Sequence, residues 1–285
     1  MQIEVNGTRL WFDVDGPALV PDGRTMRERP TIVLVHGGPG GYDHSYFKPH
    51  FEPLTRIAQL VYLDLRDHGR SARHDPAAWG FELCADDLRA FCDAIGLDHP
   101  IVFGHSMGGF VAMLLGIRHP GYAGGLILSA TNARFDLDRL VEGVRRNAGD
   151  DVAELARRDY GGEPTSVADW SRIFAAFGPR VPSADELARR ERNPAVGPHG
   201  MDLMRALDIV ADLPRIRSPV LVIAGELDGV TPVAASQEIA AGLAPGVGRL
   251  EVVEGAGHFT WLDAPDRFFG LIAEWVTALR SETSA

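Results

Sequence analysis

Lysine is almost absent from this chain of 285 residues, since only Lys48 among its 28 basic residues is a lysine. No G-x-x-x-x-G-K-[ST] loop precedes Lys48, which excludes a phosphate-binding loop of that type. Basic residues are also fewer than acidic ones, 28 against 39, which gives a formal net charge of −11. An acidic surface argues against nucleic acid or an anionic membrane as a partner. The composition therefore favours a small-molecule substrate.

Cysteine is scarce, and long apolar runs are missing. Cys84 and Cys92 fall on one expected helix, residues 81–95, roughly 12 Å apart, which is too far for a disulfide. Two unpaired thiols favour a reducing cytoplasm. No apolar run approaches the ~20 residues that a membrane span needs. The segment Met1–Gly7 lacks the features of a signal peptide, so a cytoplasmic protein is expected.

Hydrophobic patterning predicts an α/β fold. Residues 2–5 and 9–14 alternate around Asn6-Gly7, as in a β-hairpin. Uniformly apolar runs, typical of strands buried on both faces of a parallel sheet, occur at 31–35, 60–63, 101–103, 126–128, 220–224 and 250–253. Helical patterns occupy 81–95, 107–118, 233–243 and 265–279, with Pro265 at a helix start. This order indicates a doubly wound, mostly parallel sheet behind an antiparallel hairpin.

The alternation stops between residues 132 and 212. Ser183 and Glu186 have capping-box spacing, and Ser166 precedes another helical stripe. Asn193-Pro194 and Gly197-Pro198 are expected turns. We interpret 132–212 as a helical cap inserted in a core domain made of 1–131 and 213–285, rather than as a separate domain.

The candidate nucleophile is Ser106 in Gly104-His105-Ser106-Met107-Gly108, between an expected strand and an expected helix. This order is typical of a serine on a sharp turn that exposes its hydroxyl. The flanking glycines fit such a turn, because a Cβ there would collide with neighbouring chain.

A glycine-rich loop, His36-Gly37-Gly38-Pro39-Gly40, follows the expected strand 31–35. Acyl transfer places negative charge on a carbonyl oxygen, which preorganised N–H donors stabilise. The expected donors are the backbone N–H groups of Gly38 and of Met107, the residue after the serine.

The remaining members of a triad are expected after later strands. Asp228 follows the strand 220–224, where it could orient a histidine, with Glu226 and Asp136 as competing acids. His258 lies on a glycine-rich loop after the strand 250–253 and completes the order Ser, Asp, His. No Cys/His cluster or H-E-x-x-H sequence predicts a metal site, and no cofactor is expected.

These motifs make the chain resemble an α/β-hydrolase-fold serine hydrolase over essentially its whole length. Residues 64–71 are similar to a loop common after the fourth strand of that superfamily. HGGPG at His36–Gly40 resembles the proline iminopeptidase branch, which uses acidic cap residues to hold a free amine. The resemblance implies the triad Ser106, Asp228 and His258, with Gly38 and Met107 in the oxyanion hole. The turn that carries Ser106 departs from that branch. Its sequence here is G-H-S-M-G-G, whereas the branch usually has a G-G-S-W-G type.

The expected function is hydrolysis of a small carboxylic ester or lactone through an acyl-enzyme. One alternative is a proline iminopeptidase-like aminopeptidase; another is a ligand receptor or non-hydrolytic enzyme on the same fold. Trp170, Phe174 and Phe177, with the Met107 side chain, are candidate pocket walls or else ordinary core. No motif links the cap glutamates to amine binding; these are Glu142, Glu154, Glu163, Glu186 and Glu191. Oligomeric state is not predicted.

Overall fold

The amino-terminal hairpin forms where the sequence indicates it. In the computed structural model, which describes residues 1–283, Asn6 and Gly7 have φ values of 45° and 72°. A two-residue loop with two positive φ angles matches the twist of the strands it joins. It connects β1 (Gln2–Val5) to β2 (Thr8–Asp15), which confirms the expected hairpin.

The hairpin extends a sheet of eight strands in the order β1-β2-β6-β5-β7-β8-β9-β10. β2 pairs antiparallel with β6, and all pairings from β6 onward are parallel. The parallel strands are β5 (Thr31–Val35), β6 (Gln59–Asp64), β7 (Ile101–His105), β8 (Gly125–Ser129), β9 (Val220–Gly225) and β10 (Gly248–Val253). The mostly parallel sheet confirms the expected α/β fold.

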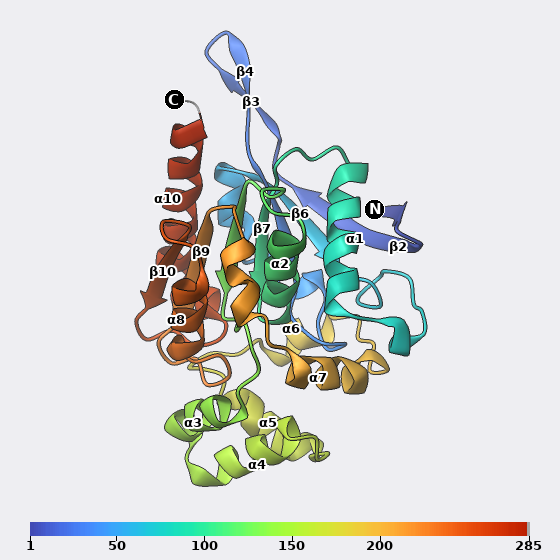
Figure 1. Ribbon diagram of the computed structural model, residues 1–285, viewed down its shortest axis with the longest axis vertical. Coiled ribbons are helices and arrows are strands. Elements are labelled where there is room, and N and C mark those ends of the chain that lie inside the picture. The colour runs from blue at the N-terminus through green and yellow to red at the C-terminus, as the bar shows by residue number, and fades with distance from the viewer. Residues whose placement is uncertain (284–285) are drawn as a thin grey trace.

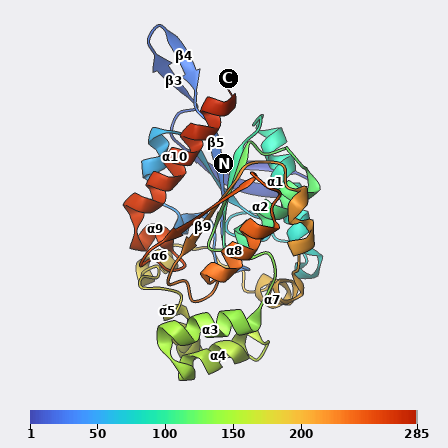
Figure 2. The ribbon, with the colours of Figure 1, turned by 60° about the vertical axis from the view of Figure 1, so that its left-hand side comes forward.

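Helices cover both faces of the sheet (Figures 1 and 2). Along β5, Val33 and Val35 pack into one apolar layer, and Ile32 and Leu34 into the other. The first layer includes residues of α1 (Phe81–Ala94), α2 (Met107–Arg118) and α8 (Val233–Gly242). The second includes residues of α9 (Thr260–Asp263) and α10 (Pro265–Thr283). Burial on both faces explains why these strands are uniformly apolar.

Between β8 and β9 the chain leaves the sheet and forms helices. They are α3 (Leu137–Ala148), α4 (Asp150–Tyr160), α5 (Val167–Ala175), α6 (Ala184–Ala188) and α7 (Val196–Ala206), followed by the 3₁₀ helix η4 (Val210–Arg215). Ser166 caps α5, and Ser183 with Glu186 forms the expected capping box of α6. In Figures 1 and 2, α3 and α4 lie beyond one end of the sheet. We call residues 132–212 the helical segment.

One local expectation needs correction, and one hairpin was not predicted. Gly197-Pro198 was expected as a turn, but both residues belong to the first turn of α7. Proline is tolerated there because a first-turn N–H has no partner within the helix. The sequence reading also did not predict β3 (Leu19–Asp22) and β4 (Thr25–Glu28), a small hairpin that projects from the body in Figure 1. Their residues are mostly exposed, so no apolar pattern marks them.

Three short 3₁₀ helices lie in the loops that follow β5 and β6. They are η1 (His44–Tyr46), η2 (Glu52–Arg56) and η3 (Pro76–Ala78). Across the described residues, none of the helices combines the length and the apolar character that crossing a bilayer requires.

Candidate active site

Ser106 lies at a strained turn between β7 and α2. Its φ of 52° and ψ of −121° are rarely adopted by a residue with a side chain. Its N–H donates to Ser129 O at 3.0 Å, and its carbonyl accepts from Thr131 Oγ1 at 2.8 Å. The surrounding structure therefore holds the serine backbone in this conformation.

The flanking glycines are required by close backbone packing. A Cβ on Gly104 would lie 2.3 Å from Gly108 O, and one on Gly108 would lie 2.2 Å from Val35 O. Neither contact is possible for a real Cβ, so larger residues would force α2 away from β5 and β7. The collisions expected from the sequence are confirmed.

Asp228 and His258 form a buried pair. His258 Nδ1 donates to Asp228 Oδ2 at 2.9 Å, and the two side chains are 4% and 0% exposed. Asp228 also accepts from the N–H groups of Val230 and Thr231 and from Thr231 Oγ1. Burial alone would raise the pKa of Asp228, but the interaction with His258 and these donors hold it below its usual range. Asp228 is therefore an ionised carboxylate that orients the His258 ring.

The competing acids serve other purposes. Asp136 is the N-cap of α3 and accepts from Arg139 N at 2.9 Å. Glu226 accepts from Gly255 N at 2.9 Å, and so holds the start of the loop that carries His258. Of the three acids considered from the sequence, the structure brings Asp228 to the histidine.

The glycine-rich loop lies beside the serine turn. Met107 is the first residue of α2, so its N–H has no partner within that helix. Gly37 N–H donates to Tyr46 Oη at 2.8 Å, and Gly40 N–H donates to His68 Nε2 at 2.8 Å. Pro39 has no N–H, which leaves Gly38 as the loop residue between these bonds that can donate to a substrate. The Met107 side chain packs against Gly38.

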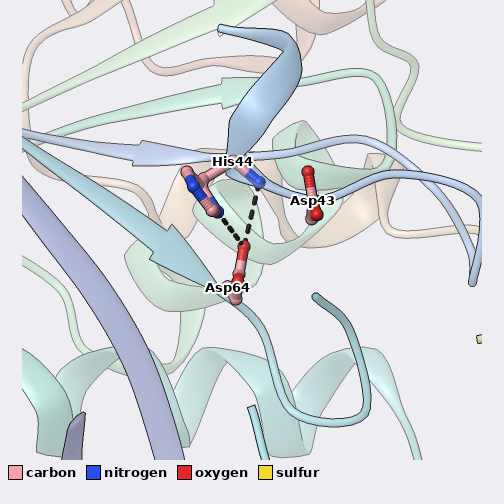
Figure 3. A group of neighbouring side chains, drawn as sticks. All are labelled: Asp43, His44 and Asp64. Atoms are coloured by element: carbon pink, nitrogen blue, oxygen red, sulfur yellow. Dashed lines mark hydrogen bonds and ion pairs between the residues drawn. The ribbon is translucent and has the colours of Figure 1, made fainter. Parts of the chain in front are cut away.

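A cluster of polar side chains holds this loop to the end of β6 (Figure 3). Asp64 Oδ1 accepts from both N and Nδ1 of His44, at 2.9 and 2.8 Å, and Oδ2 accepts from Arg70 N. Asp43 accepts from Ser45 and from Glu191 N. Asp43, His44 and Asp64 lie close enough to surround a cation. Because their carboxylate oxygens already accept hydrogen bonds, we assign the cluster a structural role.

A cavity of about 570 Å³ opens above Ser106 and His258. Its walls include Trp170, Phe174 and Phe177, all named as candidates from the sequence. The Met107 side chain is the exception: it is fully buried against Gly38 and is not a wall of the cavity. Its position directly after Ser106 turns it under the glycine-rich loop instead.

Sequence reasoning missed several polar residues of the same cavity. Tyr42, Asp159, Arg190 and Arg192 line it, although no motif marks them. Proximity to HGGPG could have indicated Tyr42, whereas the other three come from the helical segment. The five glutamates considered from the sequence do not line the cavity. Four of them interact elsewhere: Glu142 with Arg145, Glu163 with Arg158, Glu186 with Ser183 and His50, and Glu191 with Arg70.

Phe177 connects the helical segment to the loops of the Asp228–His258 pair. Its carbonyl accepts from His258 N at 3.0 Å and from Gly229 N at 3.4 Å. Nearby, Asn147 Nδ2 donates to Ala176 O and to Leu227 O, at 2.9 and 2.7 Å. The segment thus contacts both loops that carry Asp228 and His258, through the Phe177 carbonyl and the Asn147 side chain.

Comparison with known proteins identifies the family. The model of the alpha/beta hydrolase fold matches residues 30–265. The chain belongs to this family. The fold and the expected hydrolase acting on ester or amide bonds are thereby confirmed, with the support of hydrolase relatives.

The relatives include more than one kind of hydrolase. The chain is 28% identical to a monoacylglycerol lipase of Mycolicibacterium smegmatis, over 89% of this chain and 87% of the lipase. It is 29% identical to the proline iminopeptidase PfmaB of Pestalotiopsis fici, but over only 45% of this chain and 43% of that protein. The crystal structure of a proline iminopeptidase from Mycobacterium smegmatis superposes with a TM-score of 0.76, 20% identity and 99% coverage of both chains. This last likeness concerns the fold alone.

Proposed function

We propose that this α/β hydrolase cleaves a small carboxylic ester or lactone, with Ser106, His258 and Asp228 as its triad. The observation that carries the proposal is the buried Asp228–His258 pair, which opens onto the same cavity as the strained Ser106. In this role His258 Nε2 takes the Ser106 proton during attack on the carbonyl and gives it to the leaving group. Water activated by His258 then releases the acyl-enzyme.

The N–H groups of Gly38 and Met107 are the proposed oxyanion donors. Their support is geometric: Met107 N–H is free of the helix, and the neighbours of Gly38 in the loop are bonded elsewhere. Residues 132–212 are the proposed cap, which supplies Trp170, Phe174 and Phe177 to an apolar acyl site. A cytoplasmic location stays a prediction based on Cys84 and Cys92, which are both free and buried.

The alternative of a proline iminopeptidase-like activity has the HGGPG loop and the PfmaB match in its favour. An aminopeptidase of this kind needs an anion for the substrate ammonium. The glutamates considered from the sequence do not line the cavity. Within the described residues its carboxylate is Asp159, which already accepts from Thr165 Oγ1 and shares the wall with the cations Arg190 and Arg192. The ester proposal makes no such demand, which is why we prefer it.

Two chromogenic substrates measured side by side test the proposal. We expect hydrolysis of p-nitrophenyl butyrate, a loss of at least about 10³-fold in kcat for Ser106→Ala, and no cleavage of proline p-nitroanilide. Ser236→Ala, a buried serine on α8, is the matched control and keeps its activity.

Other results would contradict the proposal. Anilide cleavage that is lost when the proline nitrogen is acylated would establish the aminopeptidase. Covalent labelling of Ser106 by a fluorophosphonate without turnover of either substrate would favour the receptor or non-hydrolytic alternative.

A further inference from the structure

Two arginines of the cavity wall lack an anionic partner. Neither Arg190 nor Arg192 lies within ion-pair distance of a carboxylate in residues 1–283. Arg190 donates from Nη1 to Gly41 O and from Nε to Leu187 O, both at 2.9 Å, and its guanidinium lies 4.6 Å from the centre of the Tyr42 ring. The negative charge of Asp43 influences Arg190 only from beyond ion-pair distance. Arg190 also hydrogen-bonds to the Tyr42 side chain. A guanidinium has five N–H donors, so these three partners leave donors of Arg190 for a ligand.

Arg66, a buried arginine of this protein, does have an anionic partner. Arg66 binds Asp87 through two bonds of 2.7 and 2.8 Å, and this carboxylate raises the pKa of Arg66. Arg190 shows the opposite, because burial without an ion pair lowers its pKa. A half-buried cation is costly unless an anion joins it. A ligand of this cavity is therefore expected to carry the negative charge that Arg190 lacks.

The cavity also differs in charge from the rest of the molecule. The chain carries a formal net charge of −11. Among the described residues of the cavity wall, Asp159 is the carboxylate and accepts from Thr165 Oγ1, whereas Arg190 and Arg192 are two cations. Arg190 is half-buried, whereas Arg192 is exposed. The charge of Arg190 is therefore less screened by water and attracts an anion more strongly.

The two arginines lie near the glycine-rich loop. Arg190 Nη1 contacts Gly41 O, and Asn193 N donates to Gly40 O at 2.9 Å. Asn193 Nδ2 also donates to Asp67 O at 2.8 Å, which holds the segment 190–193 in place. Arg190, Arg192 and Ser106 line the same cavity, so one molecule could contact both the arginines and the serine.

We propose that Arg190 and Arg192 bind a free carboxylate of the substrate. This inference rests on the proposed ester or lactone hydrolysis and specifies its substrate class. A planar carboxylate matches the paired N–H groups of a guanidinium. The apolar walls at Trp170, Phe174 and Phe177 then hold the carbon chain between the carboxylate and the scissile ester. The substrate class is a half-ester or lactone acid with an apolar body.

Two matched esters test this inference. p-Nitrophenyl hydrogen adipate carries the carboxylate, and p-nitrophenyl hexanoate carries a methyl group in its place. We expect a higher kcat/KM for the adipate, and a ratio between the two substrates that falls about 10- to 100-fold in Arg190→Gln and in Arg192→Gln. Arg189→Gln is the control, because Arg189 is exposed and outside the cavity, so its ratio stays at the wild-type value.

Two kinetic outcomes would overturn the inference. They are a wild-type ratio of one or less, and a ratio unchanged in both variants. In Arg190→Gln, an unchanged ratio with an equal loss of rate for both substrates would mean that Arg190 only supports the loop at Gly41. Arg192→Gln guards against that case, because Arg192 makes no hydrogen bond to the loop among the described residues.

Calorimetry separates this inference from the proposed function. If wild-type protein turned over neither ester, hydrolysis would fail as a proposal, yet binding would still be measurable. Adipate binding to Ser106→Ala that weakens about 10-fold or more in the Ser106→Ala, Arg192→Gln double variant supports the carboxylate site. Absence of adipate binding, or tighter binding of inorganic phosphate, overturns it.

Discussion

Ser106, the proposed nucleophile, has a strained backbone. Its φ is 52°, and it lines the same cavity as Gly37, Gly38 and His258. Strain of this kind costs on the order of 1–3 kcal/mol and persists only where neighbouring structure enforces it. Here Ser129 and Thr131 bind the backbone of Ser106 and enforce it.

Relief of this strain should raise stability. Glycine adopts a positive φ without a Cβ penalty, whereas alanine retains the penalty. We expect the free energy of unfolding of Ser106→Gly to be about 1 kcal/mol higher than that of Ser106→Ala. This difference already allows for the larger entropy that glycine gives the unfolded chain. Urea unfolding of the two variants measures the difference. Equal stability would show that the turn is not strained.

At the scale of elements, two buried histidines hold the loop between β5 and η1. His36 Nε2 accepts from Leu65 N, and His68 Nε2 accepts from Gly40 N. A ring nitrogen can accept only while it is unprotonated, so both rings are neutral in the folded state. Burial, followed by the influence of His36, lowers the pKa of His68 to about 3.

This neutral ring makes stability depend on pH. Between pH 3 and 6.5 the unfolded chain binds a proton at His68 that the folded protein excludes, so stability falls as pH falls below 6.5. From pH 7.5 to 5.5 we expect the wild type to lose about 1.4 kcal/mol more unfolding free energy than His68→Gln. Urea unfolding at the two pH values measures this. His99→Gln, at an exposed histidine, is the control and should lose as much stability as the wild type. An equal loss in His68→Gln would refute the assignment of His68 as a neutral ring in the folded protein.

The elements that the sequence predicted well are those with a strong local pattern. The boundaries of β5 and α2 match the predicted ranges, because buried strands are uniformly apolar and a glycine turn precedes α2. Ser166 and Ser183 mark helix starts through bonds to residues three positions later, which are local as well. Gly197-Pro198 was misread because a proline permits either a turn or a first helical turn. Only packing of α7 distinguishes the two.

For the whole molecule, the relation between the sheet and the helical segment decides the shape of the cavity. Trp170, Phe174 and Phe177 come from the segment, whereas Ser106 and His258 come from loops of the sheet. Phe177 O and Asn147 bind backbone groups of both loops that carry Asp228 and His258. The geometry of the pair thus depends on residues distant in sequence.

Removal of this link should impair catalysis more than folding. Asn147→Ala leaves the carbonyls of Ala176 and Leu227 without their donor. We expect a drop of about 10-fold in kcat for the ester and a loss of about 1–2 kcal/mol in unfolding free energy. Steady-state kinetics and urea unfolding measure the two effects. Arg145→Ala, at an exposed ion pair of the same helix, is the control. Unchanged kcat in Asn147→Ala would show that the link does not position the pair.

The sequence by itself determined the fold class, the serine turn, the glycine-rich loop and the candidate triad. Each of these features depends on a short motif or on a periodic pattern of apolar residues, and both involve residues close together in the chain. Only the tertiary structure decided which acid meets His258, which side chains surround the cavity and where Met107 points. It also brought Arg190 and Arg192 to that cavity without ion-pair partners in the described chain. These outcomes depend on contacts between residues far apart in the chain, and no local pattern encodes such distances.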